Sequence, residues 1–362
     1  MNDAPPSDRP VKAETGRRAA RQQASTSAAK TINLALQGGG AHGAFTWGVL
    51  DRLLEEEKLA YEGISATSAG AMNAAVVAYG MTIGGREGAR KALTNFWRRI
   101  SHSSQSSPLQ PSPMDRLLRD HSLRWNPAFV FFDMLTRLMS PYEFNPMNFN
   151  PLRDVLEQSV DFDVLKRDDC PIKLFLSATN VRTGKVKIFR HHELSPDAVL
   201  ASACLPFLFQ SVEIDGEAYW DGGYMGNPAL YPLIYHTQSN DILIVHINPL
   251  ERKELPRTAT DILNRINEIS FNSSLMREMR AISFVTRLIH QQHLEEEKHV
   301  LVHGISDDAL MTGLGVASKL NADWEFLTHL RDVGRVRAEE WLATHFAKVG
   351  VESTVDIHAK FL

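Results

Sequence analysis

Cysteine is scarce in this sequence, and long hydrophobic runs are missing. Cys170 and Cys204 are the only cysteines among 362 residues. Two cysteines make no disulfide framework, and neither has a zinc-like spacing around it, so we predict a reducing compartment, the cytoplasm. No apolar run reaches the roughly 18 residues that a membrane-spanning helix needs.

An excess of charge is missing as well. The formal net charge is −4, and the 23% charged and 43% hydrophobic residues are ordinary for a globular protein. We therefore expect no nucleic-acid partner. Residues 1–30 lack large apolar side chains and the hydrophobic core of a secretion signal, which predicts a disordered basic tail. A weak contact of Arg17, Arg18 and Arg21 with an anionic surface is the alternative.

Apolar strand patterns alternate with helical patterns over nearly the whole chain. "TINLALQ" (31–37) and "DILIVHINP" (241–249) are typical of buried strands. Buried strands separated by helices predict an α/β fold with a mainly parallel central sheet and helices on both faces. Hairpin patterns near 171–190 and 212–220 argue against a purely parallel sheet.

Composition divides the chain into three parts. After the tail, residues 31–250 form the main domain, and residues 251–362 form a helical region with one strand that we expect to pack on the same domain. The segment 114–150 is rich in Phe, Met and Pro. Its part 126–148 is interpreted either as a mobile apolar cap over a site or as ordinary core packing.

The first motif is a glycine-rich loop between a strand and a helix, Gly38-Gly39-Gly40-Ala41-His42-Gly43. A dinucleotide-binding loop of this form needs an acidic residue at the end of the second strand, but Glu62 stands at that strand's beginning. The alternative is an oxyanion hole, in which backbone N–H groups at a helix N-terminus face a developing negative charge. A turn without any further role would need fewer glycines.

The second motif is Ala66-Thr67-Ser68-Ala69-Gly70, within "ISATSAGAMNAA". Its strand, serine turn and helix match a nucleophile elbow, in which small neighbours let the two backbones approach. Ala66 stands where the elbow pattern has glycine, which is tolerated if the φ angle of Ala66 is negative. Helix capping by Ser68 is the alternative.

The third motif is Asp221-Gly222-Gly223, which follows the strand "EAYW". Alone, Asp-Gly is more often a structural turn. A nucleophilic serine needs a base, however, and a carboxylate within hydrogen-bond reach of Ser68 can serve.

These three motifs, in this order, resemble the patatin-like phospholipase family over Thr31 to Pro249. "SATNVRTGK" and "ASACLPFLF" are also similar to family segments. The resemblance implies a three-layer α/β/α sandwich, with 31–250 as catalytic domain, and a serine acyl hydrolase that cleaves lipid carboxylic esters without metal or cofactor. It also implies a Ser–Asp dyad of Ser68 as nucleophile and Asp221 as base, and an oxyanion hole from the backbone of Gly38, Gly39 and Gly40.

Two positions depart from the family pattern, while Gly43, Gly70, Gly222 and Gly223 fit it. Ala66 replaces the first elbow glycine. His42 stands where the family has arginine or lysine, and we expect it either to alter the charge near the loop or to make the loop pH-sensitive.

Other histidines offer alternatives. A Ser-Asp-His triad would draw on one of four histidines after Asp221, which are His246, His290, His293 and His303. His246, in a buried strand, is better interpreted as a hydrogen-bonded structural residue. The pairs His191-His192 and His290/His293 lack a third ligand with zinc-like spacing, so no metal is expected.

Two other functions stay open, a non-catalytic patatin-fold binding protein and a nucleotide-binding oxidoreductase. For the hydrolase, the expected partner is a lipid ester, with peripheral contact at a membrane surface as an option. Phospholipids, lysophospholipids, triacylglycerols and polyesters all present such esters, and the sequence leaves the choice among them and the oligomeric state open.

Overall fold

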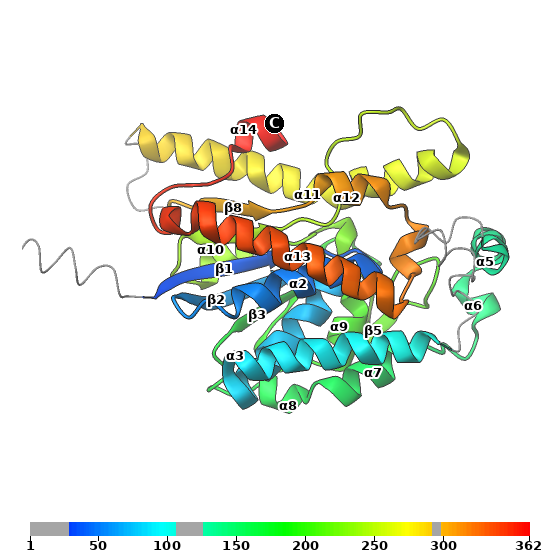
Figure 1. Cartoon of the computed structure of the whole chain (residues 1–362). Coiled ribbons are helices and arrows are strands. Elements are labelled where there is room, and N and C mark those ends of the chain that lie inside the picture. The colour runs from blue at the N-terminus through cyan, green and yellow to red at the C-terminus, as the bar shows by residue number, and fades with distance from the viewer. Residues whose placement is uncertain (1–28, 106–125, 292–297) are drawn as a thin grey trace, which may run out of the picture.

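One eight-stranded sheet organises the computed structural model, which describes residues 29–105, 126–291 and 298–362 (Figure 1). Residues 1–28 of the predicted basic tail, which include Arg17, Arg18 and Arg21, lie outside the described residues, and β1 begins at Lys30. Residues 114–125 of the proposed cap and the histidine at 293 also lie outside them.

The sheet has a parallel centre and an antiparallel extension. Its strand order is β5-β6-β3-β2-β1-β7-β8, with β4 paired to the free edge of β3. The strands are β1 (Lys30–Leu36), β2 (Leu59–Ala66), β3 (Lys173–Asn180), β4 (Val186–Phe189), β5 (Val212–Ile214), β6 (Glu217–Asp221), β7 (Asp241–Val245) and β8 (Leu301–Ile305). β3, β2, β1, β7 and β8 run parallel, while β4, β5 and β6 form antiparallel pairs. The mainly parallel sheet and both hairpins are therefore confirmed.

Helices cover both faces of the sheet, with α11 and α14 on one side in Figure 1 and α3, α7 and α8 on the other. The α-helices are α2 (Gly43–Leu53), α3 (Ala69–Ser104), α5 (Pro127–Leu138), α6 (Pro141–Phe144), α7 (Pro151–Ser159), α8 (Phe162–Leu165), α9 (Pro196–Ser202), α10 (Tyr231–His236), α11 (Ala259–His290), α12 (Asp308–Gly313), α13 (Trp324–His345) and α14 (Ile357–Phe361). Short 3-10 helices are η1 (Gly40–His42), η2 (His191–Glu193), η3 (Gly222–Tyr224), η4 (Ala317–Leu320) and η5 (Phe346–Lys348).

Two hydrophobic cores lie on opposite faces of the sheet. In β7, Leu243 and Val245 enter the larger core with α2, α3 and α13, whereas Ile242 and Ile244 enter the smaller core with α10, α11 and α14. A strand that is buried on both faces explains the unbroken apolar run "DILIV". The predicted α/β/α arrangement of layers is confirmed.

Residues beyond 250 join the same layers. β8 extends the sheet beside β7, and α13 crosses α2 with backbone touching backbone. At the crossing, a Cβ added to Gly48 would overlap the carbonyl of Arg331, and one added to Gly334 would overlap the carbonyl of Phe45. The helix that follows the glycine loop is therefore packed against the C-terminal region.

The edge of β3 brings two strand ends together. Leu176 pairs with Ala66 of β2 and also with β4, so β2 and β4 lie on opposite edges of β3. Ala178 pairs with β4 and with Asp221 of β6, so β6 shares the edge of β2. Because β6 runs antiparallel to β3, its end at Asp221 faces the end of β2, two residues before Ser68.

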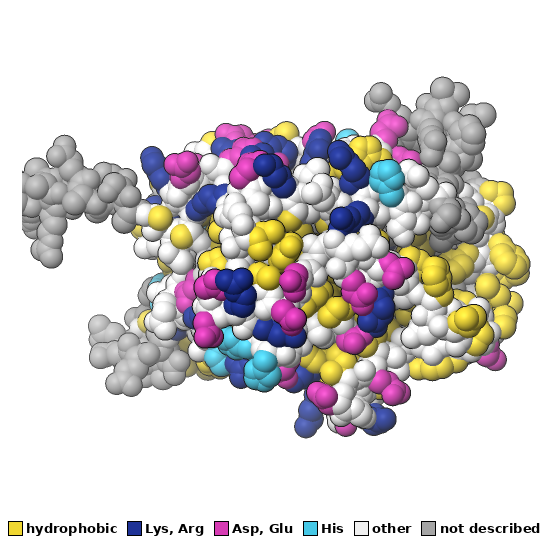
Figure 2. All heavy atoms as spheres, turned by 90° about the horizontal axis from the view of Figure 1, so that it is seen from below, with side chains coloured by type: hydrophobic (Ala, Val, Ile, Leu, Met, Phe, Trp, Pro, Cys, Tyr) yellow, Lys and Arg dark blue, Asp and Glu magenta, His cyan; other side chains and the backbone are white. Residues whose placement is uncertain are grey.

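Helix α5 stands apart from both cores. It has no buried residue, and four of its apolar side chains, Val130, Phe131, Met134 and Leu138, are at least half exposed. Figure 2 shows hydrophobic side chains gathered at the end of the molecule where Figure 1 places α5 and α6. Helix α5 is therefore not part of either hydrophobic core.

Candidate active site

Ser68 lies on a strained turn between β2 and α3. Its backbone has φ 54° and ψ −123°, a left-handed conformation that a non-glycine residue rarely adopts. Its side chain makes no capping hydrogen bond to the helix, so the alternative of a structural helix cap is wrong. Ala66 is not among the described residues with positive φ, as the elbow interpretation required.

Close packing around the turn explains the small residues of the second motif. A Cβ added to Gly70 would overlap the carbonyl of Leu36, and one added to Gly43 would lie 2.7 Å from the Cβ of Ala69. The N–H of Ser68 donates to the Oγ of Ser202 at 2.9 Å. Ser68 keeps 9% of its surface exposed. The serine is thus held by its backbone, which leaves its hydroxyl available to another partner.

Asp221 is that partner. It ends β6, it is buried, and its Oδ1 accepts the N–H of Gly223 at 2.7 Å, while the Ser68 side chain lies close enough to lower the pKa of its carboxyl group. Burial raises the pKa of Asp221 to about 6, against the opposing effects of the Gly223 N–H, the Ser68 side chain and the positive charge of Lys319. The carboxylate is therefore a stronger base than an exposed aspartate.

The glycine loop lies against the serine turn. A Cβ added to Gly38 would lie 2.6 Å from the Cβ of Ser68, so only glycine fits there. The N–H of Gly38 donates to Oδ1 of Asn227 at 2.7 Å. Within the part of the chain that the structure describes, the N–H groups of Gly39 and Gly40 make no hydrogen bond. Of the three predicted oxyanion donors, these two are available.

His42 is buried in the same loop. Its Nε2 lies 2.8 Å from the Oγ of Ser318, and burial, with help from Lys319, lowers the pKa of His42 to about 3. The ring is therefore neutral at physiological pH. Position 42 thus carries no charge where the family has arginine or lysine, and the low pKa of His42 argues against pH sensitivity near neutral pH.

Three polar residues of this site were missed by sequence reasoning. Ser202 accepts the backbone N–H of the serine turn, and Asn227 accepts a backbone N–H of the glycine loop. The positive charge of Lys319 lowers the pKa of Asp221. Ser202 lies within "ASACLPFLF", so this similar segment was the available signal. Asn227 and Lys319 stand in stretches without a recognised pattern.

Two of the four histidines considered for a triad, His246 and His303, are described with their side chains. His246 is buried, and neither ring nitrogen finds a hydrogen-bond partner within the described residues, so its interpretation as a hydrogen-bonded residue is wrong. His303 contacts Asp241 at 2.9 Å and Thr354 at 3.1 Å. The side chain of His290 and the whole of His293 lie outside the part of the chain that the structure describes.

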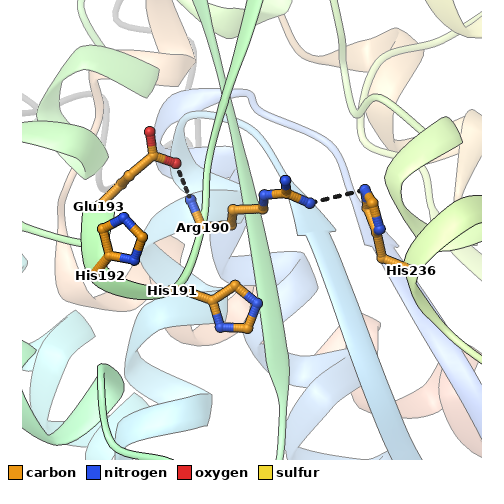
Figure 3. Close-up of a pocket in the computed structure, with 5 residues that line it drawn as sticks. All are labelled: Arg190, His191, His192, Glu193 and His236. Atoms are coloured by element: carbon orange, nitrogen blue, oxygen red, sulfur yellow. Dashed lines mark hydrogen bonds between the residues drawn. The ribbon is translucent and has the colours of Figure 1, made fainter.

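The pair His191-His192 lines a surface hollow of about 550 Å³, together with Arg190, Glu193 and His236 (Figure 3). Figure 3 shows the Arg190 guanidinium pointing at the ring of His236, with 2.8 Å between the bonded nitrogens. The hollow lies just after the end of β4, on the side of the amino end of β3. Asp221, in contrast, pairs near the carboxyl end of β3. Within the described ranges, no group of three or more His, Cys, Asp or Glu residues is arranged to hold a metal ion.

Fold and site together define a class of α/β proteins in which a glycine loop and a strained serine meet at the carboxyl end of parallel strands. The family model of patatin-like phospholipases matches residues 34–234, and the chain belongs to this family. Its members are lipid ester hydrolases, and membership makes this chain an enzyme of that kind.

Remote similarities to solved structures accompany the family match. VipD from Legionella pneumophila is 15% identical with a TM-score of 0.43, over 88% of this chain and 68% of that chain. ExoU, in its complex with SpcU from Pseudomonas aeruginosa, is 18% identical with a TM-score of 0.33, over 86% of this chain and 53% of that chain. No curated protein matches the sequence. No helix among the described residues has the length and apolarity to span a membrane.

Proposed function

We propose that this chain hydrolyses carboxylic esters of lipids with Ser68 as the nucleophile and Asp221 as the general base. The observation that carries the proposal is the closeness of the Ser68 side chain to the buried Asp221 carboxylate, whose pKa it lowers. A serine hydroxyl attacks efficiently only when a neighbouring base accepts its proton. The strained backbone at Ser68 supports the same role, since such strain is concentrated at functional sites.

The reaction has two halves. In the first, Ser68 Oγ attacks the ester carbonyl while its proton passes to Asp221, and Asp221 then protonates the leaving alcohol as the C–O bond breaks. In the second, Asp221 takes a proton from water, and the resulting hydroxide attacks the acyl-enzyme. The Ser68 Oγ–acyl bond breaks, the fatty acid leaves, and the proton returns to Ser68.

Each half passes through a tetrahedral intermediate with a negative oxygen. The N–H groups of Gly39 and Gly40 are the proposed donors to this oxygen, because they make no other bond among the described residues. The N–H of Gly38, already engaged with Asn227, fixes the loop instead. Fixed donors of this kind stabilise the developing charge without reorganising during the reaction.

Contact with a lipid surface is the second part of the proposal. Gln210 Nε2 donates to the carbonyl of Asn145, which ties the segment after α6 to the segment that follows Cys204. The carbonyl of Cys204 accepts the N–H of Asp221 at 2.8 Å. The exposed apolar side chains of α5 thus belong to a segment that is linked to the base, and we propose that they contact the lipid.

Substituting Ser68→Ala tests the nucleophile. We expect ester hydrolysis to fall by several orders of magnitude, since the attacking oxygen is lost, while the protein still folds because this hydroxyl caps no helix. Hydrolysis of a chromogenic fatty-acyl ester and thermal unfolding are the measurements. Ser101→Ala is the matched control, a buried serine on the same helix α3, and should keep full activity.

Labelling with a fluorophosphonate separates the three functions. A hydrolase is labelled at Ser68, and the label disappears in S68A. A binding protein without catalytic power shows no label and no turnover. An oxidoreductase would bind NAD(P) or a flavin, although Glu62 is already bonded to the N–H groups of Gln238 and Ser239 at the other end of β2. Retained hydrolysis in S68A would refute the assignment.

A further inference from the structure

Lys319 packs against the glycine loop, although it belongs to η4, which lies outside the residues that match the family. Gly40 has φ 59°, and a Cβ added there would overlap the carbonyl of Lys319. The neighbouring Ser318 bonds His42 from the same short helix. The loop therefore rests on η4 at two of its residues.

The ammonium group of Lys319 is bonded to the loop through one side-chain amide. Its Nζ donates to Oδ1 of Asn248 at 2.9 Å. The Nδ2 of Asn248 donates in turn to the carbonyl of Gly38 at 2.7 Å, and the N–H of Asn248 donates to Oε1 of Gln37 at 3.0 Å. A displacement of the ammonium group would be transmitted to the first glycine of the loop.

The same ammonium group is the positive charge that acts on Asp221. The other groups that influence Asp221 are the Ser68 hydroxyl and the Gly223 N–H, and neither carries a net charge. Burial and the charge of Asp221 both raise the pKa of the Cys204 thiol and of the Tyr224 phenol to about 12, so both are neutral near pH 7.

The ammonium group of Lys319 lies over an aromatic ring beside the proposed base. Its Nζ lies 5.7 Å from the centre of the Phe271 ring, within cation–π range. The edge of that ring would lie 3.0 Å from a Cβ at Gly223, the residue that donates to Asp221. Lys319 is therefore connected to both parts of the site, to the glycine loop through Asn248 and to Asp221 through the Phe271 ring.

We propose that Lys319 is the positioning residue of this site, which holds the glycine loop against Ser68 and supplies the positive charge that neutral His42 does not. This inference rests on the proposed hydrolase function. It assigns to the C-terminal region, beyond the family match, a part in the chemistry: its charge favours the ionised form of the base, and its bond to Asn248 keeps the loop N–H groups in place.

The test compares Lys319→Met with Lys319→Arg. In K319M we expect kcat to fall on the order of 100-fold through misplacement of the loop, with little change in KM. The acid limb of kcat/KM should move to higher pH, because Asp221 loses its positive neighbour. K319R should recover both properties in part.

Lys298→Met is the matched control, because Lys298 is also a partly buried lysine, bonded to the carbonyls of Leu233 and Thr237 far from the site. It should lower stability and leave the acid limb in place. A merely structural Lys319 would behave like Lys298. Wild-type kcat and an unmoved acid limb in K319M would overturn the proposal.

A double-mutant cycle of K319M with Asp221→Asn, followed by urea unfolding at pH 7, needs no turnover. At this pH Asp221 is mostly ionised, and Lys319, whose pKa burial lowers to about 8, is still mostly charged. Coupling between the two substitutions supports the contact between Lys319 and the base, and additive effects overturn it. This separates the two hypotheses: S68A activity decides the hydrolase, while the cycle decides the role of Lys319.

Discussion

At the scale of single residues, Asp221 combines burial with a charge. A buried carboxylate that ionises only above about pH 6 is held in the folded chain at a cost to stability. In the unfolded chain the same group has its ordinary value of 3.8. The folded state therefore binds the proton more tightly, so stability from this group is fully present below about pH 4 and is lost as pH rises through about 6.

Asp221→Asn removes this ionisation. The difference of about two pKa units corresponds to about 3 kcal/mol, so the stability of the variant relative to wild type should rise by about that amount between pH 4 and pH 8. Urea unfolding at the two pH values measures it. In wild type, the acid limb of kcat/KM should lie near the same pH of about 6. A relative stability that falls with increasing pH would contradict the raised pKa.

Sequence reasoning found Ser68 and Asp221 because each stands in a local motif whose chemistry depends on its neighbours. It did not find Lys319, because a cation that arrives from a distant segment leaves no spacing in the sequence. The interpretation of His246 failed for a related reason. A buried strand position predicts the burial of an imidazole ring, but its hydrogen-bond partners depend on the elements that pack against it.

At the scale of elements, α5 is a helix that is rich in apolar residues, four of which are exposed. Asn126 caps it by accepting from the N–H groups of Ala128 and Phe129, so local sequence explains the helix. Its Phe and Met content, however, suits a core as well as a surface. Only the packing of the surrounding elements decides between them, which is why the sequence left both interpretations open.

Leu138→Asp tests the lipid contact of α5. Leu138 is 75% exposed, so the change should leave folding intact. If the side chain enters lipid, its burial is worth about 1.5–3 kcal/mol, and binding to phosphatidylcholine vesicles should weaken by about tenfold or more. Cosedimentation with vesicles measures this, and hydrolysis of a water-soluble short-chain ester should be unaffected.

Val351→Asp is the matched control, because Val351 is 72% exposed and lies outside α5. Equal vesicle binding by both variants and wild type would remove α5 from the contact.

At the scale of the whole molecule, the crossing of α2 and α13 joins the family-matched part to the C-terminal region. Gly334→Ala should destabilise the protein, because its Cβ has no room beside the carbonyl of Phe45. Overpacking costs about 1–3 kcal/mol, which opposes and exceeds the gain of up to about 1 kcal/mol in helix propensity. Denaturant unfolding measures the balance.

Gly313→Ala is the control at an open position, since no atom lies within 4 Å of its added Cβ. It should change stability little. Equal free energies of unfolding for the two alanine variants would show that α2 and α13 move apart to accommodate the added methyl group.

Alternation of strands and helices predicted the parallel sheet and its two covered faces, because each buried strand needs an apolar layer on either side. The order of the strands was beyond such reasoning. That β6 continues the edge begun by β2 depends on the pairings of Leu176 and Ala178, which no local pattern encodes.

This shared edge makes β3 a spacer between the proposed nucleophile and the proposed base. Ala66 pairs with Leu176 and Asp221 with Ala178, so two residues of a strand that carries neither group set their separation. A slip of β6 by one residue would carry the carboxylate about 3.4 Å along the edge and turn it to the opposite face of the sheet. Insertions or deletions in β3 should therefore be as damaging as loss of the aspartate itself, whereas conservative exchanges there should be tolerated.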